Sequence, residues 1–70
     1  MFLIYRVYVN AMGDEHSPVR YGRRDNWATA RSVAQSRSLL DRQRTETRWK
    51  VVRSDDLSVV CSFGPYRTAP

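Results

Sequence analysis

The chain has 70 residues, with 12 basic and 7 acidic side chains and a formal net charge of +5 at pH 7. A chain of this length forms one small domain with a thin core, because it buries only about 60% of the surface that its unfolded form exposes. One cysteine excludes an internal disulfide, and a single histidine argues against a zinc site built by this chain alone. We therefore expect no metal, no cofactor and no enzyme.

The apolar N-terminal stretch, MFLIYRVYV, is interpreted as structure rather than as a signal peptide. Arg6 interrupts it, and it has neither a basic leading segment nor a small-residue cleavage site. No stretch approaches the roughly 20 apolar residues that cross a bilayer. These features favour a soluble, cytoplasmic protein without a membrane partner.

Residues 2–9 are rich in β-branched and aromatic side chains, which predicts a strand in a central position of a sheet. The even positions include Arg6, so the odd set is expected to face the core: Leu3, Tyr5, Val7 and Val9. Residues 10–18 contain Asn, Gly, Asp, Ser and Pro, which predicts a turn or loop. A short edge strand is expected over 19–23, where charge discourages further pairing.

A helix is expected to begin at Trp27, with Asp25 or Asn26 as its N-cap. At about 100° per residue, one apolar face of this helix would comprise Trp27, Ala30, Val33, Ala34 and Leu40. Arg37 falls on the same side. It should therefore snorkel at the rim of the sheet, unless the helix is already frayed there.

Two further strands are expected over 48–54 and 57–63, joined by a three-residue loop at 54–56. Their alternation places one set of side chains inward: Trp49, Val51, Leu57, Val59, Cys61 and Phe63. The resulting order, β-β-α-β-β, predicts an α+β domain over residues 1–64. Its antiparallel sheet has four strands, or five if the C-terminal end adds a short edge, with one helix packed on one face. Residues 65–70 are expected to form a tail.

Several reactive side chains are interpreted as structural. The segment GDEHS at 13–17 combines carboxylates, a histidine and a hydroxyl, but consecutive loop residues diverge and have no supporting scaffold. Cys61 lies at an inward strand position and is interpreted as a small core residue. Asp55 and Asp56 are too few to bind a metal ion well, and the scattered glycines form no phosphate loop.

A sheet with one helix leaves its other face uncovered. The predicted strand orientations place there Phe2, Ile4, Arg6, Tyr8, Arg20, Arg48, Lys50, Val52 and Val60. Aromatic, aliphatic and cationic side chains together are typical of a binding surface, in which arginine and tyrosine are enriched. This surface is the main sequence argument for a docking protein.

The central part of the chain, residues 20–53, carries ten basic and three acidic residues, which favours a partner with a negative surface. One hypothesis is a small basic module that contacts DNA or RNA backbone, with Tyr5 or Tyr8 stacking on bases. Charge supports it. However, the signatures of an RNA recognition motif, a helix-turn-helix and a zinc finger are absent.

The other hypothesis rests on a resemblance. The segments YGRRDNWATARSVAQS and WKVVRSDDLSVVCSF follow one another as in small phage-encoded inhibitors. In particular they resemble some type I anti-CRISPR proteins, in which a strand, a helix with alanines spaced as Ala30 and Ala34, and a hairpin occur in this order. The chain is also similar in outline to phage inhibitors of bacterial RNA polymerase. The resemblance implies non-enzymatic blocking of a nucleic-acid-handling complex, such as a CRISPR effector, in the cytoplasm of the host cell.

Docking on a protein or ribonucleoprotein complex is the favoured hypothesis, because aromatic side chains and concentrated arginine both suit a protein interface. The expected polar contacts are Arg20, Arg23, Arg24 and Arg31, and the expected apolar anchors are Phe2 and Tyr8. Arg31 with Gln35 forms a second candidate surface on the helix. The edge at 19–23 also leaves room for a homodimer formed by strand pairing.

Overall fold

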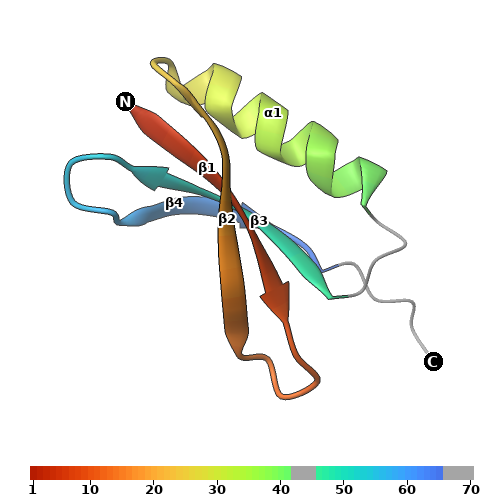
Figure 1. The fold of residues 1–70 in the computed structure, drawn as a ribbon. Helices are drawn as coiled ribbons and strands as arrows, with labels where there is room; N and C mark the ends of the chain where they lie inside the picture. The colour runs from red at the N-terminus through yellow and green to blue at the C-terminus, as the bar shows by residue number, and fades with distance from the viewer. Residues whose placement is uncertain (42–45, 66–70) are drawn as a thin grey trace.

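The computed structural model describes residues 1–41 and 46–65. Its elements are β1 (Phe2–Val9), β2 (Glu15–Arg24), α1 (Trp27–Leu40), β3 (Thr47–Arg53) and β4 (Val59–Phe63). The strands form one antiparallel sheet in the order β2-β1-β3-β4, and α1 lies across one face of it (Figure 1). The predicted α+β class and the central position of β1 are confirmed. The predictions of a tail and of a fifth strand concern mainly residues 66–70, which lie outside the described residues.

The core lies between α1 and the sheet. It is a cluster of buried side chains from β1, α1 and β3: Ile4, Ala30, Ala34, Trp49 and Val51. The two alanines are fully buried, and their small side chains allow the helix backbone to approach the strands. Cys61 and Phe63 of β4 pack against the margin of this cluster, as their alternation predicted.

The predicted orientation of β1 is wrong. Ile4 is fully buried in the helix-side core and pairs with Val51, so the even positions face α1 and the odd positions face the uncovered side. Both sides of β1 are apolar, and Arg6 was the only polar residue that distinguished them. Arg6 nevertheless lies on the helix side, where its guanidinium is 5.6 Å from the ring centre of Tyr8. A long aliphatic stem allows arginine to occupy such a half-buried position.

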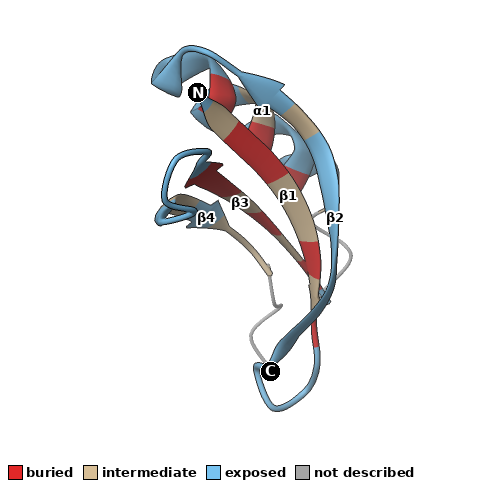
Figure 2. Cartoon of the chain, turned by 60° about the vertical axis from the view of Figure 1, so that its left-hand side comes forward, coloured by how far each residue is buried: buried red, intermediate tan, exposed pale blue. Residues whose placement is uncertain are grey.

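β2 is longer than predicted, because it begins at Glu15 and includes part of the expected loop. The turn before it is closed by Asn10, whose Oδ1 accepts hydrogen bonds from the backbone N–H groups of Met12 and Asp14, both at 2.9 Å. β2 is an edge strand, and all of its residues except Gly22 are exposed (Figure 2). The cationic edge that the sequence indicated is therefore present and extended.

The helix begins at Trp27 with Asn26 as its N-cap, which confirms one of the two predicted caps. Asn26 Oδ1 accepts a hydrogen bond from the backbone N–H of Thr29 at 3.2 Å. Leu40, predicted on the apolar face, is 74% exposed. The buried side of α1 contains Ala30, Ala34 and Ser38. Leu40 lies six residues after Ala34, which corresponds to a rotation of about 240° around the helix axis, so its side chain leaves the buried side. Among the described residues, no helix is long and apolar enough to span a membrane.

The hairpin after the helix differs from the prediction at its turn. Leu57 has a φ of 58° and lies outside β4, with 63% of its surface exposed. Asp56 lengthens the turn, because its Oδ1 accepts hydrogen bonds from the backbone N–H and the hydroxyl of Ser58. A shift in the pairing then sets Val59 opposite Val52, and Val59 is half-exposed rather than inward.

Candidate functional site

The two predicted apolar anchors do not stand on an open surface. Phe2 is half-buried on the helix side, and its ring centre lies 5.8 Å from that of Trp27. Tyr8 is also half-buried, and its ring stacks at 5.8 Å on the imidazole of His16. Both rings therefore pack within the domain. They therefore do not lie on the uncovered face, where the sequence placed them, and a contact of either ring with a partner stays a prediction.

An uncovered face does exist, and it includes the predicted Arg20, Arg48, Lys50 and Val52, but the odd positions of β1 lie on it instead of the even ones. Leu3, Val7, Val9 and Val52 lie there and are nonetheless buried, although no helix covers them. The side chain of Glu15 explains part of this burial, because it extends from β2 across β1 to β3. Its two carboxylate oxygens lie 2.6 Å from Arg48 Nη1 and 2.6 Å from Lys50 Nζ.

These ion pairs alter the titration of Glu15. The hydrogen bond from Lys50 lowers the pKa of this carboxyl below its ordinary value. Partial desolvation opposes that effect, and the hydrogen bond from Arg48 adds to it. Glu15 is therefore ionised at neutral pH, and its single negative charge offsets one of the two positive charges that Arg48 and Lys50 bring to the uncovered face.

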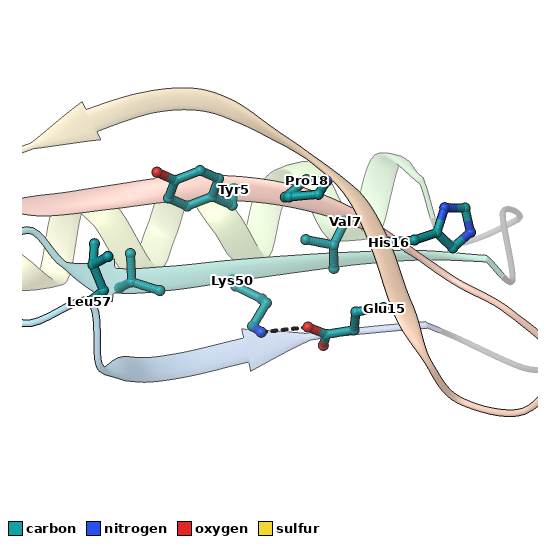
Figure 3. A pocket seen from close by; sticks show the side chains of 8 residues that line it. Tyr5, Val7, Glu15, His16, Pro18, Lys50 and Leu57 are labelled. Carbon is teal, nitrogen blue, oxygen red and sulfur yellow. Dashed lines mark hydrogen bonds and ion pairs between the residues drawn. The ribbon is translucent and has the colours of Figure 1, made fainter.

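Beside these ion pairs the uncovered face is hollowed. The hollow has a volume of about 330 Å³, and Figure 3 shows side chains from three strands and the β3–β4 turn around it. Its lining is mainly apolar and includes Tyr5, Val7, Pro18, Val52 and Leu57, with Lys50 and Glu15 at one side. Such a hollow can receive an apolar side chain of a protein partner.

The arginines of β2 lie on both sides of the sheet edge. Arg20 and Arg23 pair with Tyr5 and Leu3, and cross-strand partners share a face, so these two arginines face away from α1. Arg24 turns towards the helix side. Its Nη1 donates a 2.6 Å hydrogen bond to the carbonyl of Arg23.

Arg37 of α1 completes this edge and was not among the predicted contacts. Its guanidinium carbon lies 4.8 Å from the ring centre of Tyr21, so the predicted snorkelling at the rim of the sheet is confirmed. Tyr21 in turn packs edge-on against Trp49 at 5.1 Å. We name Arg20, Arg23, Arg24 and Arg37 the basic edge.

Arg31 and Gln35 are exposed on the opposite side of α1. Burial raises the pKa of the Cys61 thiol, and the charge of Arg31 acts in the other direction, which places Arg31 towards β4. The second candidate surface on the helix is therefore separate from the basic edge. The sequence groups Arg31 with Arg23 and Arg24, whereas in the structure Arg31 lies apart from them.

The four arginines of the basic edge have no carboxylate partner within 4.0 Å in residues 1–41 and 46–65, where Glu15 is the acidic residue that forms ion pairs. Their charge is therefore directed to solvent.

Between β2 and α1 lies a second, more polar hollow of about 270 Å³. Its lining comprises Tyr21, Arg24, Ser32, Val33, Ser36 and Arg37. The two serines are one helical turn apart. Of this set, the sequence prediction named only Arg24 as a contact residue, because nothing local in the chain links a helical serine to an arginine on the edge strand.

The side chains that suggested acid–base chemistry do not converge. Glu15 is held by Arg48 and Lys50, and His16 Nδ1 lies 3.0 Å from the hydroxyl of its neighbour Ser17. Within the described part of the chain, no cluster of three or more His, Cys, Asp or Glu side chains could hold a metal ion.

Comparison of the chain with protein-family models, with curated proteins and with solved structures finds no match.

Proposed function

We propose that the protein is a non-enzymatic binding module that contacts the phosphate backbone of DNA or RNA through the basic edge. The observation that carries the proposal is the exposure of these arginines without carboxylate partners in the described residues, whereas Arg48 and Lys50 both form ion pairs with Glu15. Phosphate contacts supply most of the affinity of non-specific nucleic-acid binding, and guanidinium groups suit them because they donate two parallel hydrogen bonds.

The structure changes the balance between the two hypotheses from the sequence. The sequence favours docking on a protein because of the concentrated arginine, the absence of nucleic-acid-binding motifs, and the expectation that Phe2, Ile4 and Tyr8 lie on the uncovered face. Ile4 is fully buried, and the two rings pack within the domain. The basic edge does not depend on these residues. If the protein acts as a phage-type inhibitor, we propose that this edge contacts the nucleic acid of the target complex.

A salt titration tests the proposal. The binding of fluorescently labelled random duplex DNA and single-stranded RNA would be followed by anisotropy at increasing salt concentrations. We expect the logarithm of the binding constant to fall linearly with the logarithm of salt concentration, by about 0.9 per phosphate contact for duplex DNA. The absence of binding at low salt, about 50 mM, would overturn the proposal.

Charge-reversal variants locate the surface. We expect R23E/R24E to lose nearly all binding, because it reverses two charges of the basic edge. R31E/R53E is the matched control, since it makes the same change in net charge on residues outside that edge. Equal losses in both variants would show that binding depends on overall charge and would refute the placement at β2.

The apolar hollow on the uncovered face supports a second candidate function, docking on a protein of a nucleic-acid-handling complex. The specific observation is that Leu57, 63% exposed, lies at this hollow beside Tyr5 and Val52. Affinity capture from host-cell extract tests it. L57D should then abolish capture of a discrete protein while R23E/R24E retains it, and the reverse result would favour the basic edge.

A further inference from the structure

We infer that the hollow between β2 and α1 is a binding site for one phosphate group, held by the guanidinium groups of Arg24 and Arg37 and the hydroxyls of Ser32 and Ser36. The inference deepens the proposed function and rests on it for the source of the phosphate, the backbone of a nucleic acid. It goes further because it assigns one phosphate to a defined set of side chains rather than to general positive charge.

The first support is the composition of the hollow. Two consecutive elements, β2 and α1, bring two cations and two hydroxyls to a space of about 270 Å³. A phosphate group offers several oxygen acceptors, and arginine and serine supply donors of the kind that phosphate contacts use. A carboxylate is missing from the lining, so the local charge is positive.

The second support is the way in which Arg24 is held. Its Nη1 donates to the carbonyl of Arg23 at 2.6 Å, which leaves most of its five N–H donors available. The same Nη1 lies 3.5 Å from the position that a Cβ on Gly22 would occupy. This distance is an ordinary van der Waals contact, so the guanidinium lies directly over Gly22, on the helix side of β2.

The third support is the position of Arg37. Its guanidinium packs over the ring of Tyr21, and that ring also packs edge-on against Trp49. A cation–π contact with the ring needs no N–H donor, so the N–H groups of the guanidinium remain available to an anion. Two like charges that line one small hollow repel each other, and a bound anion would relieve that repulsion.

The fourth support is the pair of serine hydroxyls in the lining, which would donate hydrogen bonds to a phosphate without adding charge. Ser32 and Ser36 lie one turn apart on the side of α1 that borders β2, and both are exposed. Neither hydroxyl has a hydrogen-bond partner among the described residues, in contrast to Ser38, whose hydroxyl donates to the carbonyl of Gln35. Removing the two hydroxyls therefore tests the site without changing net charge or a buried contact.

A titration of the full chain with inorganic phosphate tests the site directly. Amide chemical shifts would be followed by NMR, with sodium chloride at equal ionic strength and sodium acetate as comparisons. We expect phosphate to shift the amides of Tyr21, Arg24, Ser32, Ser36 and Arg37, and acetate and chloride to shift them much less. Shifts spread evenly over all arginines, or none at these amides, would overturn the inference.

Variants then separate this inference from the proposed function. S32A/S36A should weaken binding of labelled RNA by about 10-fold or more, because two hydrogen bonds to a charged group are lost. The matched control, S54A/S62A, removes two exposed hydroxyls elsewhere and should leave the affinity unchanged. If S32A/S36A binds RNA like the unmodified protein while R23E/R24E does not, the phosphate site is refuted and the basic edge stands. Phosphate binding in the hollow without binding of nucleic acid would support the site and refute the proposed function.

Discussion

The carboxylate of Glu15 lies 2.6 Å from the ammonium group of Lys50, although 35 positions separate them and β1 runs between their strands. A second oxygen of the same carboxylate contacts Arg48. These side chains cross the uncovered face and shield Val7, which is 5% exposed without a helix above it. They also tie the edge strand β2 to β3.

Protonation of Glu15 at acidic pH should weaken its ion pairs with Arg48 and Lys50. Because the pKa of Glu15 is lowered on folding, its stabilising contribution is fully present above the ordinary value of 4.5 and is lost as pH falls through the folded value. We expect E15Q to cost about 0.5–1 kcal/mol at neutral pH, since the ion pairs are partly exposed. E15Q should also lose less stability than the unmodified protein between about pH 5 and about pH 3. Urea unfolding across this range measures both effects. D14N, at the neighbouring exposed carboxylate, should behave like the unmodified protein.

The indole of Trp49 should depend on Asp41 for its hydrogen bond. Trp49 is 4% exposed, and its Nε1 donates to Asp41 Oδ2 at 2.9 Å, just beyond the end of α1. D41A would leave the buried indole N–H without a partner and should cost about 1–3 kcal/mol. D41N keeps an acceptor oxygen and should cost clearly less. Urea unfolding compares the two, and equal losses would contradict the role of this hydrogen bond.

Ile4 provides a test of the orientation of β1. Its side chain is fully buried between the sheet and α1, so I4A should destabilise the domain by about 2–5 kcal/mol. L57A serves as the exposed control and should change stability by less than about 0.5 kcal/mol. Thermal or urea unfolding measures both. A small effect of I4A would support the orientation predicted from the sequence instead.

The Cys61 thiol should react slowly at neutral pH. Burial raises its pKa above the ordinary value of 9.0, and Arg31 only partly opposes this effect. The thiolate is the reactive form, so alkylation by iodoacetamide should remain slow at pH 7 and accelerate only above about pH 9. R31Q should slow the reaction further at alkaline pH. Rapid modification of the folded protein at pH 7 would contradict the half-buried position of Cys61.

Local patterns predicted much of this fold. The bounds of β1 follow from its run of β-branched and aromatic residues. The two N-cap candidates, Asp25 and Asn26, follow from side chains that can accept a backbone hydrogen bond within three residues, and Asn26 makes that bond. The inward positions of Trp49 and Val51 follow from alternation with charged neighbours. In each case the deciding interaction lies within a few residues of the chain, so the sequence contains it in readable form.

The tertiary structure decided which face of β1 meets the helix. Both of its sides are apolar, so no local pattern selects one. Arg6 led to the wrong predicted orientation because the aliphatic part of its side chain can be buried beside Tyr8. Pairing with β3 makes the selection, since Ile4 is opposite Val51 and both must share a side. The side of a doubly apolar strand is thus set by its neighbours and not by its own residues.

The composition of the candidate site likewise depends on how separate segments pack together. The sequence alone determined that the chain is small, basic and α+β, and that arginines gather around residues 20–24. Only the tertiary structure brought Ser32, Ser36 and Arg37 to the same hollow as Arg24. Strand pairing and the packing of α1 on the sheet are interactions between distant segments. Their outcome depends on all the segments together, and no single stretch of the chain encodes it.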